Sequence, residues 1–197
     1  MRSTALRLAI AAIAIAAFMG LASSAMAFTI SPTGAVTGTS TDTKLTLTSS
    51  GLALTCATSS VTATVNSAGA GTVAVGGLTY GGCTNSTFGS FVVTQRSALT
   101  VSTSLLTSPV GVLILFTLPA RAVNIHSQLL NCDFTVTGTA GILIPGPLPI
   151  TATRFTLNLS NLRVDSTGGG CALAAPLNLG ASYTGNYNLN HSLIVTG

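Results

Sequence analysis

Apolar and polar residues alternate with a period of two along most of the chain after residue 27. In the segment 130–137, Leu, Cys, Phe and Val occupy the even positions, and Asn, Asp and Thr occupy the odd positions. A period of two is typical of a strand with one buried and one solvent-facing side, so we expect Cys132 inside and Asp133 towards water. The same alternation runs through four further segments: 52–56, 61–65, 155–159 and 183–193.

Short clusters rich in glycine or proline separate these alternating segments. They lie at 67–71, 76–77, 81–82, 145–147 and 168–170. No segment after residue 27 shows the 3.6-residue apolar stripe of an amphipathic helix. Many short strands separated by turns predict an all-β fold, either an antiparallel β-sandwich or a barrel-like sandwich, with about ten strands.

Two segments are apolar without alternation. The first, 110–118, lies between Pro109 and Pro119 and is too short to cross a bilayer as a helix, so it is most simply a central core strand. The second, 141–150, is an apolar loop that contains three prolines. The sequence leaves open whether these segments form core or contact surface.

Residues 1–27 have the pattern of a cleavable secretory signal peptide, which would be helical. Arg2 and Arg7 precede an apolar run, and Ala25-Met26-Ala27 fits the small-x-small rule for cleavage before Phe28. A retained membrane anchor is the alternative, but glycine interrupts the apolar run. We therefore expect general secretory export, cleavage after Ala27, and a location outside the cell or at its surface.

The exported chain divides by composition into a leader, 28–50, and a single β domain, 51–197. The leader is rich in Thr, Ser and Gly, and its only charged residues are Asp42 and Lys44. In one interpretation it packs loosely and adds a strand to the sheet edge of a second copy, so that deleting residues 28–40 leaves a folded monomer. In the other it is the domain's own first edge strand, preceded by a disordered tail.

The composition excludes most catalytic chemistry. Only 5% of the residues are charged, against roughly 25% in an average soluble domain. Three acidic residues and two histidines are too few for most acid–base pairs and carboxylate metal cages, so we predict a protein that is not an enzyme and has no cofactor or metal. The exported chain has five scattered cations and no cluster that would bind nucleic acid.

Neither histidine is a good candidate for a catalytic base. His191 is in phase with Leu189 and Leu193, which predicts a core or rim histidine, and His126 lies near an expected strand end. We therefore assign no catalytic residue.

Two other pairs of residues invite a functional interpretation. Tyr183 and Tyr187 share a strand face and could bracket a sugar chain, but core packing is favoured because the same face continues into leucines. Arg163 and Asp165 are expected to form a pair on the surface.

All four cysteines lie in the exported part of the chain, at Cys56, Cys83, Cys132 and Cys171. An even number in an oxidising compartment favours two disulfides, and no close cysteine pair suggests a zinc site. Three connectivities are possible. Chain order and two similar Gly-Gly-Cys contexts favour Cys56 with Cys83 and Cys132 with Cys171.

A resemblance rests on several of these patterns together. The signal peptide and leader are followed by Leu54-Thr55-Cys56, Gly81-Gly82-Cys83, the segment 132–138 and the segment 181–185. This layout resembles small secreted all-β proteins of bacteria, especially actinobacteria, and is loosely similar to the secreted activators of alkane oxidation. The resemblance covers most of the exported chain and implies an exported β-fold with paired cysteines, without any catalytic residues to transfer.

These observations favour a non-catalytic secreted or cell-envelope protein with a structural or interaction role. Its partners would be further copies of itself or envelope components. The alternative is an extracellular binding module for an apolar ligand or lipid, motivated by segments 110–118 and 141–150. A secreted hydrolase is third, because acidic residues are so few. A cavity inside the domain would favour the binding module over the structural protein.

Overall fold

The computed structural model describes residues 28–48, 52–107, 110–167, 171 and 179–197. These residues confirm the all-β antiparallel prediction and form twelve strands, more than the ten expected, and no α-helix. The strands are β1 (Thr29–Ser31), β2 (Gly34–Ser40), β3 (Thr43–Leu47), β4 (Ala53–Val65), β5 (Gly71–Val73), β6 (Leu78–Asn85), β7 (Gly89–Gln95), β8 (Leu99–Thr107), β9 (Val110–Ser127), β10 (Cys132–Pro145), β11 (Ile150–Thr167) and β12 (Leu179–Thr196). The expected signal peptide, 1–27, lies outside the described residues. The described residues contain no helix that is long and apolar enough to cross a membrane.

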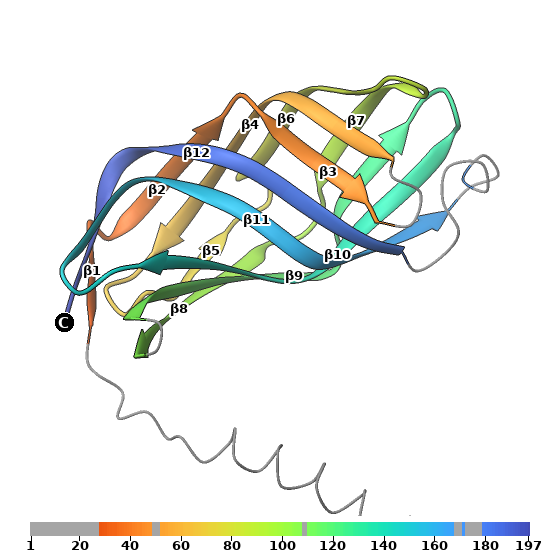
Figure 1. Cartoon of the computed structure of the whole chain (residues 1–197). Coiled ribbons are helices and arrows are strands. Elements are labelled where there is room, and N and C mark those ends of the chain that lie inside the picture. Colours follow the sequence, from red (N-terminus) through yellow and green to blue (C-terminus); the bar gives the residue numbers. More distant parts are fainter. Residues whose placement is uncertain (1–27, 49–51, 108–109, 168–170, 172–178) are drawn as a thin grey trace, which may run out of the picture.

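The strands form one sheet that closes on itself (Figure 1). From β12 the pairing runs through β11 and β10 to β9. Two pairs of shorter strands then join β9 to β4, with β7 and β6 forming one connection and β8 and β5 the other. Finally, β2 and β3 pair with β4 on one side and with β12 on the other, which completes the ring.

Strand β9 changes partners along its length. Residues 110–117 pair with β8, and residues 123–127 pair with β7. Between these two parts, the register with β10 shifts after Val136. An irregularity of this kind tolerates Pro119 inside a strand, because its missing N–H group is not needed there. The expected core strand 110–118 therefore continues past Pro119 to Ser127, and its partner changes from β8 to β7 along the way.

The leader contributes three strands to the sheet. β1 pairs with the end of β12, while β2 and β3 are paired on both sides. In the turn between β2 and β3, Asp42 accepts hydrogen bonds from Ser40 Oγ at 3.0 Å and Asn186 Nδ2 at 3.2 Å, and the bond from Asn186 lowers the pKa of Asp42. The first expectation, a loosely packed leader, was therefore wrong, because both edges of β2 and β3 are paired. The second holds for β1, which pairs with β12 alone among the described strands, but not for β2 and β3.

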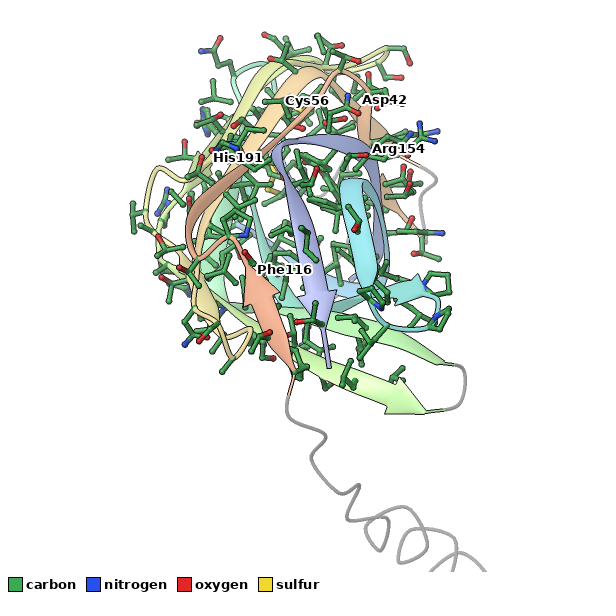
Figure 2. All side chains as sticks on the ribbon, turned by 90° about the vertical axis from the view of Figure 1, so that its left-hand side faces the viewer. Asp42, Cys56, Phe116, Arg154 and His191 are labelled. Atoms are coloured by element: carbon green, nitrogen blue, oxygen red, sulfur yellow. A yellow bond between two sulfur atoms is a disulfide. The ribbon has the colours of Figure 1, made fainter. Side chains whose placement is uncertain are left out.

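Side chains alternate between an apolar interior and a polar exterior. In β10, Cys132, Phe134 and Val136 are buried as the alternation predicts. On the outside, Arg163 Nε and Asp165 Oδ1 lie 3.7 Å apart and form the expected surface pair. Figure 2 looks onto the closed sheet from one side and shows an outer surface rich in hydroxyl and amide groups around a carbon-rich interior.

The two segments that lack alternation supply core on their inner face. Val112 in β9 and Ile142 in β10 are buried, and both strands have neighbours on either side. On the outer face, Leu143 is 39% exposed. The segment 110–118 therefore lies within β9. The prediction of a loop over 141–150 was wrong for residues 141–145, which belong to β10, and only residues 146–149 form the turn before β11.

Candidate binding site

The closed sheet encloses an apolar cavity of about 90 Å³. Its wall consists mostly of aliphatic side chains that point inward from β3, β4, β6, β7, β8, β9, β10 and β11. Among the described residues, no charged side chain lines it. The oxygen-bearing side chains in the wall are all hydroxyls: Thr43, Tyr80, Tyr183 and Tyr187.

A second apolar cavity of about 70 Å³ lies next to the first, and Val61 and Phe116 line both. Tyr187 faces the first cavity and Phe155 the second, and their rings stack with centroids 5.2 Å apart. These four side chains form a partition, and Phe116 is visible within the ring of strands in Figure 2. An apolar cavity of about 150 Å³ can bind benzene, and the two cavities together have a similar volume.

All three tyrosines of the chain lie in the wall of the first cavity. Tyr183 and Tyr187 are hydrogen-bonded through their hydroxyls, and Ser59 Oγ donates to Tyr187 Oη at 2.9 Å. The ring of Tyr80 packs edge-on against Tyr183, with centroids 6.3 Å apart. The expected core packing of Tyr183 and Tyr187 is confirmed, and their hydroxyls form a polar cluster within an otherwise apolar wall.

Burial raises the pKa of Tyr80, Tyr183 and Tyr187 well above the ordinary value, and the neighbouring phenols raise each pKa further. The hydroxyl cluster is therefore uncharged at neutral pH. It can exchange hydrogen bonds with a ligand but cannot neutralise a charge.

We expect an alkaline titration to show no tyrosinate until the protein unfolds. A tyrosine in the unfolded chain ionises near pH 10, whereas the pKa of the folded tyrosine is higher. Ionisation therefore favours the unfolded chain, so the free energy of unfolding is at its full value below pH 10 and decreases as the pH rises above 10. Each phenol contributes at most about 1.4 kcal/mol per pH unit to that decrease. The measurement records ultraviolet absorbance, which reports tyrosinate, and circular dichroism, which reports folding, on the same samples as a function of pH. Tyrosinate absorbance that develops while the circular dichroism is unchanged would contradict burial of the cluster.

Thr43 adds an unpaired hydroxyl to the same wall. Thr43 is the first residue of β3 and pairs with Cys56 of β4. A side chain on Gly185 of β12 would place its Cβ only 2.8 Å from Cγ2 of Thr43, so the glycine leaves the space that Thr43 occupies. Thr43 is 2% exposed, and within the described part of the chain only its Oγ1 and Ser97 Oγ are buried without a hydrogen-bond partner. The Thr43 hydroxyl does interact with that of Tyr183, outside the length and angle of a full hydrogen bond, and this weak contact lowers the pKa of the phenol against the dominant effect of burial.

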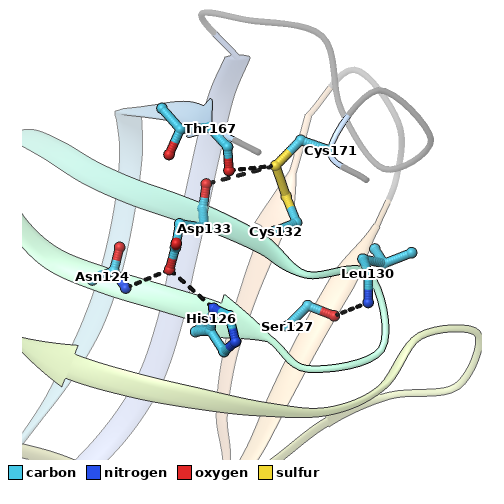
Figure 3. Close-up of polar contacts among 8 residues, drawn as sticks. All are labelled: Asn124, His126, Ser127, Leu130, Cys132, Asp133, Thr167 and Cys171. Carbon is cyan, nitrogen blue, oxygen red and sulfur yellow. Dashed lines mark hydrogen bonds and ion pairs between the residues drawn. A yellow bond between two sulfur atoms is a disulfide. The ribbon is translucent and has the colours of Figure 1, made fainter. Parts of the chain in front are cut away.

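A separate polar cluster lies on the outer face where β9 ends and β10 begins (Figure 3). Asp133 Oδ1 accepts a hydrogen bond from Asn124 Nδ2 at 2.8 Å and lies 3.1 Å from His126 Nδ1. The bond from Asn124, followed by the contact with His126, lowers the pKa of Asp133. Nearby, Ser127 Oγ accepts a hydrogen bond from the Leu130 N–H at 3.3 Å, so this hydroxyl stabilises the turn between β9 and β10. The contacts of Asp133 with Asn124 and His126 therefore link β10 to β9 through side chains.

The two disulfides have the expected connectivity. Cys56 is bonded to Cys83, which joins β4 to β6, and Cys132 is bonded to Cys171. Cys56 also lines the first cavity, so the first bridge supports its wall directly. Two disulfides are consistent with an oxidising environment outside the cytoplasm.

His191 does not lie where the alternation placed it. The register between β11 and β12 shifts where Ala152 pairs with Leu193 and Arg154 pairs with Asn188, so β12 has more residues than β11 between these pairs. This irregularity breaks the alternation and turns His191 to the solvent, where its side chain is exposed. The prediction of a core or rim histidine was therefore wrong.

Sequence reasoning identified neither Thr43 as a wall residue nor Ser59 as the buried hydrogen-bond partner of Tyr187. Strict alternation from Cys56 places residues 58 and 60 inside, but the inward face shifts by one position and Ser59 is buried instead. Gly82, on the strand that pairs with this part of β4, has a φ of 60°. The Gly-Gly pair at 81–82 was the signal for an irregularity at this point.

Comparison of the chain with protein-family models, with curated proteins and with solved structures finds no match in any of the three. Function must therefore be argued from the site. Nowhere in the described ranges do three or more His, Cys, Asp or Glu residues gather to hold a metal ion. What the geometry offers is a pair of apolar cavities with hydroxyl groups in one wall.

Proposed function

We propose that this domain is a non-catalytic binding module that holds a small, largely apolar ligand inside the closed sheet. The observation that carries the proposal is the pair of adjacent cavities, whose walls are almost entirely apolar. A ligand that fills them leaves water for an apolar surface, which contributes about 25 cal/mol per Å² of buried apolar area. Sites of this kind are concave and apolar, with a few polar groups that orient the ligand.

Binding is favoured over catalysis because the cavity hydroxyls have no base beside them. A hydroxyl nucleophile needs a general base within hydrogen-bond reach. His126 is held by Asp133 on the outer face, and His191 is exposed on β12. Neither histidine lines either cavity.

Binding is also favoured over a structural, self-associating role. A leader that adds a strand to a second copy needs an unpaired edge, and β2 and β3 are paired on both sides within the chain. We further propose that the module acts after export, since the signal-peptide pattern in residues 1–27 and the two disulfides both fit an extracellular location.

Methylcyclohexane should bind to the exported domain and contact the tyrosine wall. The chain has three tyrosines and no tryptophan, so tyrosine fluorescence reports on the first cavity alone. We expect a saturable fluorescence change and nuclear Overhauser effects between the probe and tyrosine ring protons. Absence of both signals in the wild-type domain would refute the proposal.

A pair of matched variants locates the probe. Val61→Phe places a ring where both cavities meet and should abolish the two signals, whereas Val92→Phe, at a 49% exposed position on the outside of β7, should leave them unchanged. Melting temperatures show whether each variant is folded. Equal binding by the Val61→Phe domain would mean that the probe lies elsewhere.

A further inference from the structure

Among the described residues that line the first cavity, the polar side chains are the hydroxyls of Thr43 and the three tyrosines. Thr43 Oγ1 is buried and has no hydrogen-bond partner within the described residues, and it is near Tyr183, whose hydroxyl bonds to Tyr187. An unsatisfied buried hydroxyl destabilises the fold, because it has given up its hydrogen bonds to water without replacing them. A ligand oxygen beside Thr43 would remove that destabilisation, because a threonine hydroxyl can both donate and accept.

The cavity also determines the charge of its ligand. No Lys, Arg, His, Asp or Glu among the described residues lines either cavity. A carboxylate, phosphate or ammonium group placed there would lose its hydration without meeting an opposite charge, which is strongly unfavourable. The tyrosine hydroxyls, kept neutral by burial, would bond to a neutral oxygen but would not balance an ion.

We propose that the ligand is a neutral molecule with an apolar body and one hydroxyl or carbonyl oxygen, and that this oxygen becomes the hydrogen-bond partner of Thr43 Oγ1. The apolar body would occupy the first cavity and extend past Phe116 towards the second. This inference rests on the proposed binding function and specifies the chemical class of the ligand.

Three probes of similar shape test the inference on the folded, disulfide-bonded domain. Cyclohexanol carries the oxygen, methylcyclohexane replaces it with a methyl group, and cyclohexanecarboxylate carries a charge. By tyrosine fluorescence we expect cyclohexanol to bind more tightly than methylcyclohexane after correction for their solubilities in water, by about fivefold for one hydrogen bond. Cyclohexanecarboxylate should bind most weakly at neutral pH.

Three variants assign the preference to Thr43. Thr43→Val keeps the shape of the side chain and should remove the fivefold preference for cyclohexanol, while binding of methylcyclohexane is retained. Thr43→Ser should keep the preference. Ser97→Ala removes the other unpaired buried hydroxyl, which lines none of the cavities described here, and should change neither affinity.

The outcomes separate this inference from the function on which it rests. If no probe binds the wild-type domain, the binding function itself is wrong. If methylcyclohexane and cyclohexanol bind equally, or if Thr43→Val retains the preference for cyclohexanol, the cavity binds apolar molecules but the assignment of the oxygen to Thr43 is overturned. If the carboxylate binds best, the inference of a neutral ligand is overturned.

Discussion

A chain that lacks residues 28–47 should not fold. β2 and β3 are the strands that pair with both β4 and β12, so the deletion opens the sheet and exposes two long unpaired edges and the apolar interior. The loss is comparable to the whole stability of a domain, about 5–15 kcal/mol. Thermal unfolding followed by circular dichroism should show no cooperative transition, and size-exclusion chromatography should show expanded or aggregated material.

Two further truncations serve as controls. A chain that begins at Phe28 keeps all described strands and should melt cooperatively. A chain that begins at Thr33 loses only β1, which pairs with β12 alone, so it should stay folded and melt at a lower temperature because buried Ile30 is gone. If the chain without residues 28–47 melts like the one that begins at Phe28, the leader strands do not close the sheet.

The secondary structure could be read from the sequence because the period of two is a local property. Cys132, Phe134 and Val136 are buried because neighbouring side chains of a strand point to opposite faces. The same rule placed Tyr183 and Tyr187 inside.

The wall of the cavity could not be predicted from the same rule. Irregularities in β4 and β12 shift the inward face, so Ser59 turns inside and His191 turns outside. Thr43 is polar and adjoins the turn that contains Asp42, which is typical of a surface residue, yet Gly185 on a strand more than 100 residues away makes room for it. Contacts of this separation depend on the closure of the sheet, and local patterns do not encode them.

The role of the leader was missed for a related reason. Its composition of Thr, Ser and Gly resembles that of a solvated terminus, and few residues before Leu45 suggest a core. In the structure its small side chains fit beside larger ones, as at Gly38, where a Cβ would lie 3.3 Å from the ring of Phe155. Small residues in this segment therefore allow close packing against the aromatic partition.

Replacing both cysteines of either disulfide with alanine should destabilise the domain strongly. The bridges span sequence separations of 27 and 39 residues, and in the chain-entropy model loops of this length contribute about 4 kcal/mol each. For a domain of this size that corresponds to a decrease of roughly 10 °C in melting temperature. Changing both partners together avoids an unpaired buried thiol.

The two double variants should differ in their effect on binding. Cys56 lines the first cavity, so Cys56→Ala with Cys83→Ala should weaken methylcyclohexane binding as well as stability. Cys132 and Cys171 line neither of the two larger cavities, so their replacement should lower the melting temperature while the affinity of the folded fraction is retained. A peptide map under non-reducing conditions checks the connectivity first. If it links Cys56 to Cys132 or Cys171, or if neither double variant lowers the melting temperature, the bridges do not stabilise the closed sheet in the way described.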